Sequence, residues 1–163
     1  MSEVGCLRDV HCQNTEVSGI AVIPNLYGGI QRQTAAGAMT IGEHTTFVVF
    51  AVDGSGSDVV TLPSAKVGRH LKIFWEVVQA TGDRVLTRAG SDDMVGQINC
   101  SIGGAGDAGD GDVLSVTDAT VTITIVDDIN IGSMLELNCA KEGQWLVSGH
   151  IAYDAVGSIP TIV

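Results

Sequence analysis

A stretch rich in glycine and aspartate, residues 103–112, carries the residue types best suited to chemistry. Its glycines fit a GxGxxG pattern, but that pattern binds a pyrophosphate only between a strand and a helix, and here a second strand-like segment follows. Asp107 and Asp110 would also repel phosphate, whereas Asp107, Asp110 and Asp112 together offer clustered hard oxygen ligands. Clustered carboxylates suit Ca²⁺, although the stretch lacks the spacing and the closing glutamate of an EF-hand. We expect a solvated loop, with Ca²⁺ binding as the alternative.

The cysteines were considered as metal ligands. Cys6, His11 and Cys12 supply three potential zinc ligands, whereas structural zinc sites use four, usually with paired spacings. These residues are therefore expected to have no metal role. Cys100 and Cys139 occur in strand-like contexts, so we interpret them as small core residues rather than as a disulfide.

Catalytic patterns are weak. There is no G-x-S-x-G nucleophile elbow, and Ser148, His150 and Asp154 lie on one strand and its exit, where they would not assemble a triad without other partners. The acid pairs Asp92–Asp93 and Asp127–Asp128 occur in turn-like contexts, and a glycosidase needs two acids that converge across a cleft. We therefore expect no enzyme activity and no cofactor.

The chain is acidic, with 8 basic and 19 acidic residues and a net charge of -11. Nucleic-acid binding depends on clustered lysine and arginine, and the basic residues here are scattered, so we expect no nucleic-acid partner. The polar first residues do not resemble a signal peptide, and no apolar run approaches the ~18 residues needed to cross a membrane. We expect a protein made in the cytoplasm.

Residues 70–77 follow a period of two, with large apolar residues at every odd-numbered position, which predicts a half-buried strand within residues 69–78. The predicted inner face carries Leu71, Ile73, Trp75 and Val77. The predicted outer face carries His70, Lys72, Phe74 and Glu76. Phe74 is the large aromatic residue on this polar face, which indicates a contact with another subunit or with the N-terminal segment.

Similar short segments recur along the chain, separated by glycine-rich turns. We predict strands at residues 38–41, 45–52, 58–62, 83–87, 94–99, 113–116, 120–126, 134–139 and 144–151, with residues 157–163 as an edge segment. No helix and no repeat of fixed period is evident. The pattern predicts an all-β fold, an antiparallel β-sandwich of jelly-roll type.

Residues 1–36 lack a clean periodicity. They mix charges with a short apolar run at residues 20–23, followed by Pro24 and a glycine pair. We interpret them as an extended N-terminal arm that contains one strand at most and lies on its own domain or on a neighbour, with a disordered tail as the alternative. Residues 37–163 would then form the β-sandwich domain.

Several segments resemble small β-sandwich proteins that decorate the capsids of tailed phages, especially marine and cyanobacterial phages. They are VVTLP (59–63), SAKVG (64–68), RHLKIFWEV (69–77), GDRVLTRAGSDDMVGQI (82–98), ATVTITI (119–125) and NIGSMLELNCAKEGQWLVSGHI (130–151). Near their C-terminal end those proteins often carry the pattern G-S-x-x-x-L…G-x-W-x-V-x-G. The residues that match it here are Gly132, Ser133, Leu137, Gly143, Trp145, Val147 and Gly149. The resemblance covers about residues 40–151; the arm lies outside it, and the glycine/aspartate loop looks like an insertion.

This resemblance implies a cement protein, a homotrimer on the outer surface of the virion that binds the major capsid protein and clamps neighbouring capsomers. The expected subunit or capsid contacts are Ile20, Val22, Ile23, Tyr27 and Phe74. The alternative is a tail-fibre or receptor-binding module of lectin type. Its sugar site would need exposed aromatic residues, whereas both tryptophans fall on inward-facing positions.

Overall fold

The computed structural model describes residues 29–102, 112–153 and 161–162, and this part of the chain contains twelve strands and no helix. The first sheet contains β1 (Ile30–Gln33), β3 (Phe47–Phe50), β5 (His70–Trp75), β7 (Asp93–Ile102), β8 (Asp112–Thr120), β10 (Met134–Lys141) and β11 (Gln144–Tyr153). The second contains β2 (Met39–Thr40), β4 (Ser57–Thr61), β6 (Asp83–Thr87), β9 (Thr122–Ile125) and β12 (Thr161–Ile162). No helix in these ranges is long and apolar enough to cross a membrane.

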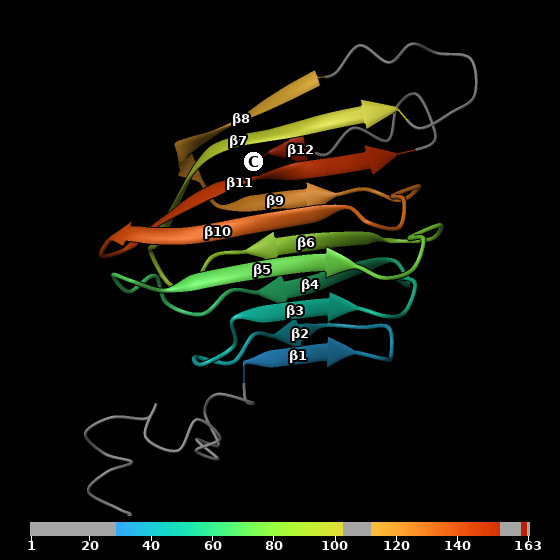
Figure 1. The fold of residues 1–163 in the computed structure, drawn as a ribbon, viewed down its shortest axis with the longest axis horizontal. Helices are drawn as coiled ribbons and strands as arrows, with labels where there is room; N and C mark the ends of the chain where they lie inside the picture. The colour runs from blue at the N-terminus through green and yellow to red at the C-terminus, as the bar shows by residue number, and fades with distance from the viewer. Residues whose placement is uncertain (1–28, 103–111, 154–160, 163) are drawn as a thin grey trace, which may run out of the picture.

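The two sheets lie one behind the other (Figure 1). The strand order is β1-β3-β5-β10-β11-β7-β8 in the first sheet and β12-β9-β6-β4-β2 in the second. From β1 to β6 the chain changes sheet at every strand, so that β1, β3 and β5 pair in parallel in one sheet, and β2, β4 and β6 pair in parallel in the other. This half of the molecule therefore consists of stacked coils, each with one strand per sheet.

The second half of the chain closes the sheets with mostly antiparallel strands. β10 pairs with β5 and then with β11, and β9 pairs with β6 and then with β12, all antiparallel. β7 inserts parallel to β11, and β8 returns antiparallel to β7. The first sheet therefore ends at β1 on one side and β8 on the other, and the second ends at β2 and β12.

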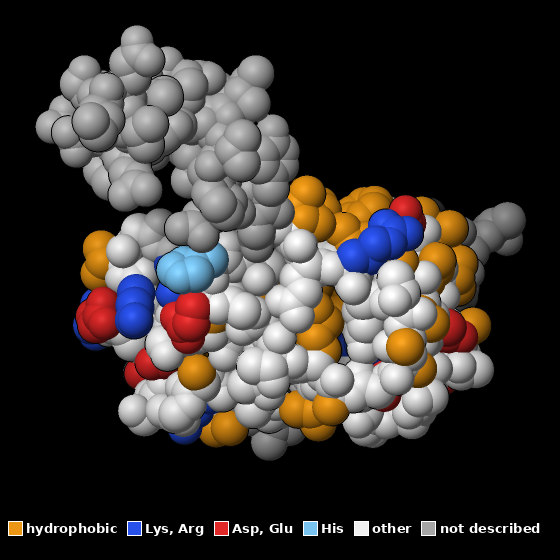
Figure 2. All heavy atoms as spheres, turned by 90° about the horizontal axis from the view of Figure 1, so that it is seen from below, with side chains coloured by type: hydrophobic (Ala, Val, Ile, Leu, Met, Phe, Trp, Pro, Cys, Tyr) orange, Lys and Arg blue, Asp and Glu red, His pale blue; other side chains and the backbone are white. Residues whose placement is uncertain are grey.

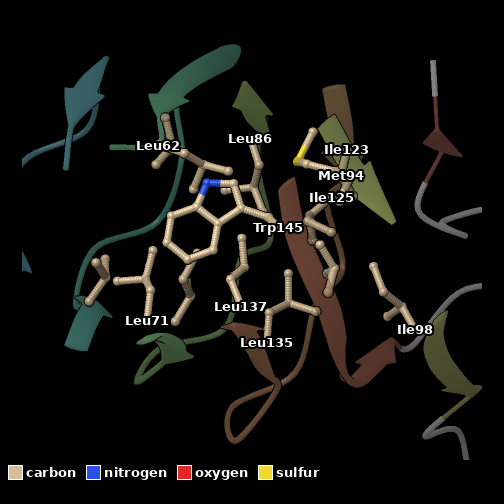
Figure 3. Packing of buried hydrophobic residues seen from close by; sticks show 14 of the residues in the cluster. Leu62, Leu71, Leu86, Met94, Ile98, Ile123, Ile125, Leu135, Leu137 and Trp145 are labelled. Atoms are coloured by element: carbon tan, nitrogen blue, oxygen red, sulfur yellow. The ribbon is translucent and has the colours of Figure 1, made fainter. Parts of the chain in front are cut away.

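Both sheets contribute to one hydrophobic core. Trp145 of β11 lies at its centre, among Leu62, Leu86 and Leu137 (Figure 3). The Trp145 indole donates a hydrogen bond of 3.3 Å to the carbonyl of Pro63, which satisfies its only donor inside the core. The predicted inner residues of residues 69–78 are confirmed in part: Leu71, Ile73 and Trp75 are fully buried, whereas Val77 is half-buried beyond the end of β5.

Most of the strand predictions are confirmed within a few residues, and so is the all-β class. Cys100 and Cys139 are members of the core, as expected. The antiparallel prediction was wrong, because both sheets are mixed. Jelly rolls are built from antiparallel strands, so the jelly-roll topology is not confirmed.

The expected boundary at residue 36 also differs from the structure. β1, within the segment expected to be an arm, pairs in parallel with β3 and extends the first sheet by one strand. The rest of the expected arm, residues 1–28, lies outside the described residues.

A charged pair is buried between the sheets. The parallel register of β4 and β6 places Asp58 directly opposite Arg84, and the Arg84 guanidinium donates to the Asp58 carboxylate over 2.7 Å. Arg84 also donates to the carbonyl of Val52 over 2.8 Å and lies over the Phe50 ring, 4.6 Å from its centroid. Burial lowers the pKa of Arg84, and the Asp58 charge opposes this shift.

A second buried polar group joins the two sheets. The Gln79 carboxamide accepts a hydrogen bond of 3.0 Å from the Trp75 indole of the first sheet. It donates to the carbonyls of Gly82, Ile125 and Val126, at the ends of β6 and β9 in the second sheet. A core glutamine whose oxygen and nitrogen are both used fixes how the sheets meet, because any shift would leave a polar atom unpaired.

We expect Arg84→Met to lower the free energy of unfolding by about 3–5 kcal/mol, because Asp58 would remain charged and buried without a partner. The double variant Arg84→Met with Asp58→Leu should recover most of this loss. Urea unfolding of the two variants and of Asp58→Leu alone completes a double-mutant cycle. Additive losses, with no recovery in the double variant, would contradict the coupling.

A glycine makes the closest approach between β7 and β11. Gly96 lies opposite Val147 with a φ of 144°, at an irregularity in the β7–β8 pairing, and a Cβ atom there would collide with the Val147 carbonyl oxygen. Gly132 has a φ of 91° but open space around its Cβ position, so it provides a matched control.

Gly96→Ala should therefore destabilise the fold by about 3 kcal/mol or more, since both the backbone and the β7–β11 contact must distort. Gly132→Ala should cost only about 1–2 kcal/mol, the penalty of a left-handed backbone alone. Thermal or urea unfolding of the two variants measures the difference. Equal losses would mean that the close contact relaxes at no cost.

Candidate interaction surface

The outer face of the first sheet carries an apolar patch that we call the Phe74 patch. Its members are Ile30, Phe47, Val49, Phe74 and Met134. They come from β1, β3, β5 and β10, which are neighbours in the sheet. The sequence predicted Phe74 on the outer face, and this is confirmed, because the flanking residues Ile73 and Trp75 are buried in the core.

Strand register gathers these residues. Phe74 lies opposite Val49 on one side and Met134 on the other, and Ile30 lies opposite Phe47 in the neighbouring row. The Phe47 and Phe74 rings stack with centroids 6.4 Å apart and planes 27° apart. Val49 is only 8% exposed yet is not part of the core cluster, so side chains on the outer face cover it. Ile30 is 67% exposed at the free edge of the sheet.

Ion pairs border the patch. Arg32 of β1 pairs with Glu76 just after β5, and Lys72 of β5 pairs with Glu136 of β10 over 2.6 Å. The hydrogen bond from Lys72 lowers the pKa of Glu136. The cationic groups next to the patch are thus neutralised within the sheet. An apolar centre with a paired polar rim is the composition of a protein–protein contact.

A second feature is a hollow of about 420 Å³ at the end of the coils, between the β2–β3 and β4–β5 connections. Its polar lining includes His44, Lys66 and His70, together with Glu43 and Arg69. Arg69 bonds Glu43 over 2.6 Å and thereby lowers the pKa of that carboxyl group. Figure 2 shows charged and histidine side chains gathered at one end of the face formed by β1 and β2. Glu43 and Arg69 thus neutralise each other, and Lys66 adds a further cationic group to the lining.

The catalytic candidates do not converge. His150 bonds Ser101 of β7 over 3.0 Å rather than Ser148, and Asp154 lies outside the described residues. Sequence reasoning missed Ser101, because only the parallel β7–β11 pairing brings it to His150. A Ser–His pair resembles part of a nucleophilic site, but this one is exposed on a sheet face, and its two strands are hydrogen-bonded on both sides.

The two acids of the first pair, Asp92 and Asp93, are each bonded to another residue of the fold. Asp92 accepts a hydrogen bond of 2.6 Å from the Ala65 amide, and Asp93 pairs with Arg88 over 3.2 Å. The two carboxylates therefore serve different neighbours. Asp127 and Asp128 are half-buried in the turn after β9, where Asp128 has a φ of 63°.

The metal candidates and most of the expected contact residues lie outside the described residues: Cys6, His11, Cys12, Ile20, Val22, Ile23, Tyr27, Asp107 and Asp110, and also the side chain of Asp112. Within the described part of the chain, no group of three or more His, Cys, Asp or Glu residues could hold a metal ion. The Phe74 patch is thus the candidate site that the described residues form, and sequence reasoning found one of its five members.

Comparison with known proteins finds no matching family model, curated protein sequence or solved structure.

Proposed function

We propose that the protein is a structural virion protein that binds the outer surface of a phage capsid and cements neighbouring capsomers. The observation that carries the proposal is the Phe74 patch: stacked aromatic rings and an exposed Ile30 on a flat sheet face, bordered by internal ion pairs. A flat apolar face with a neutralised rim suits a broad protein surface better than a small molecule, which needs a concave site.

The charge of the chain supports the same function. A net charge of -11 keeps the protein soluble at high concentration and discourages contacts between copies away from their binding surface. Five of the seven described basic residues, Arg32, Arg69, Lys72, Arg84 and Arg88, are each engaged in an ion pair. Binding would then depend on apolar contact and on backbone bonds, which retain their strength in salt.

We extend the proposal to assembly. The protein acts as a homotrimer on the major capsid protein, and its jelly-roll-like sandwich presents an N-terminal arm to a neighbour. Ile20, Val22, Ile23 and Tyr27 supply arm contacts, and Phe74 supplies the sheet contact. An arm that becomes ordered loses about 1–2 kcal/mol of backbone entropy per residue, so the surface that receives it must offer matching apolar area.

Phe74→Ser should weaken capsid binding by about tenfold or more, because central aromatic residues of an interface dominate its affinity. Val59→Ser is the matched control, since Val59 is 40% exposed on the outer face of the second sheet. The chain is co-expressed with the major capsid protein encoded in the same genome, and the protein that pellets with the particles is quantified.

Light scattering on the purified chain gives its oligomeric state. We expect the purified chain to be a trimer. We also expect Val59→Ser to retain capsid binding and Phe74→Ser to lose it. Equal binding of both variants would remove the patch from the interface. A genome that encodes no capsid protein would overturn the proposed function, and glycan binding by the purified chain would favour a receptor-binding module instead.

A further inference from the structure

The end of the molecule at β1 and β2 is built differently from the coils behind it. Gln31 and Gln33 of β1 occupy the inner positions where β3 carries Val48 and Phe50 and β5 carries Ile73 and Trp75. Those four apolar residues are fully buried. Two glutamines thus face a hollow of about 410 Å³ between β1 and β2.

The Gln31 side chain makes the hydrogen bonds that a neighbouring strand would make at the free edge of β2. In the second sheet the residue after each strand donates a bond to the next strand: the Ile41 amide donates to Thr61 O and the Leu62 amide to Thr87 O, both over 2.9 Å. On the free side of β2, the Gln31 carboxamide donates to Thr40 O over 2.9 Å and accepts from the Gly42 amide over 3.0 Å. A residue of a parallel neighbour opposite Ile41 would make this same pair of bonds.

Gln33 leaves a polar atom unsatisfied. Its nitrogen donates to the carbonyl of Gly37 over 2.7 Å, but its Oε1 is buried without a hydrogen-bond partner, in a residue only 8% exposed. Buried acceptors are nearly always paired, so this atom indicates that a donor is supplied from outside the described residues. An extended backbone laid across the hollow offers such N–H donors.

The chain contains a segment that fits. Residues 18–24 read SGIAVIP, and residues 57–63, which include β4, read SDVVTLP. The two share their serine and their proline at the same spacing, and the four residues before each proline are apolar or β-branched. In the second stretch Val60 and Leu62 are buried while Val59 is 40% exposed. By this pattern Ala21 and Ile23 would face inward, and Ile20 and Val22 outward.

The segment between residues 18–24 and β1 is about as long as the connections between the later strands of the coils. β2 leads to β3 through residues 41–46, and β4 leads to β5 through residues 62–69. A strand ending at Val22 would lead to β1 through residues 23–29, a connection of intermediate length. A parallel strand at the free edge of β2 is therefore within reach of the chain that β1 belongs to.

We propose that the free edge of β2 is an acceptor site for residues 18–24 of the same chain, which add a parallel strand with Ile23 opposite Ile41 and replace the Gln31 carboxamide. Such strand addition derives its affinity from backbone bonds and its register from alternate side chains. It covers the edge of the second sheet that would otherwise pair with another chain. The inference does not rest on the capsid function. It leaves Ile20 and Val22 on the outside for partner contacts, whereas Ile23 would pack against its own chain instead of a partner.

The register is tested by a disulfide in the full-length chain with Cys6→Ser and Cys12→Ser as background. Val22→Cys with Thr40→Cys places the two thiols opposite each other, whereas Ile20→Cys with Thr40→Cys is offset by two residues along the strand. The expected result under mild oxidation is a link within one chain for the first pair, at least about tenfold faster than for the second. Non-reducing electrophoresis and peptide mass mapping identify the link.

Other outcomes overturn the inference. A link between two chains would place the segment on a second copy, and equal rates for both pairs would mean that the segment has no defined register. Hydrogen exchange gives an independent reading in a Gln31→Ala background, where no carboxamide can bond the Gly42 amide when the strand is displaced. There Ile23→Asp should speed exchange of the Gly42 amide by about tenfold, while Val22→Asp should not. Unchanged exchange in both variants would show that residues 18–24 do not pair with β2.

Discussion

The alternation of the chain between two sheets is the constraint on which the rest of the fold depends. Because each of the first strands is followed by a strand of the opposite sheet, no early pair can form a hairpin, and every partner comes from a distant part of the chain. A single strand of this kind has little stability by itself. Stability comes when both inner faces are covered by each other, which is why Trp145, Leu62 and Leu86 from distant strands meet in one core.

Burial of apolar groups alone would not fix which coil lies next to which. The Asp58–Arg84 pair and the Gln79 carboxamide add directional bonds at the places where β4, β6 and β9 must align. Slippage of β4 along β6 would separate the charges in the dry interior, at a cost larger than the loss of a few apolar contacts. We therefore interpret these groups as devices that specify register more than as sources of stability, a distinction that the double-mutant cycle measures.

The sequence predicted which residues face inward because alternation is a local property of each strand. It did not predict parallel pairing, since a period of two is the same in parallel and antiparallel strands. The coils also gave no repeat signal: Ile30 pairs with Phe47 and Phe47 with Lys72, so successive coils differ in length. The sequence did not locate β1 within residues 1–36 for a related reason, because Gln31 and Gln33 replace the apolar residues that would have marked its inner face.

The candidate site also divides into a part that is visible within one strand and a part that depends on strand pairing. Phe74 stood out because an aromatic residue interrupts a polar face, which is visible within one strand. Phe47 and Met134 gave no such signal, because β3 is apolar on both faces and Met134 begins a strand. Only the order β1-β3-β5-β10 joins them into one surface. Contacts within a strand are readable from the sequence, whereas a surface that crosses strands needs the register.

Charge and apolar surface have separate roles in this molecule. Five ion pairs use basic side chains at positions 32, 69, 72, 84 and 88. The chain has 19 acidic and 8 basic residues, so the field around the protein is negative. Two copies that approach through arbitrary faces repel each other over about 10 Å at physiological salt. Close contact is then favoured where apolar area is concentrated and neighbouring charges are already paired. The Phe74 patch meets both conditions, because Arg32–Glu76 and Lys72–Glu136 neutralise its border.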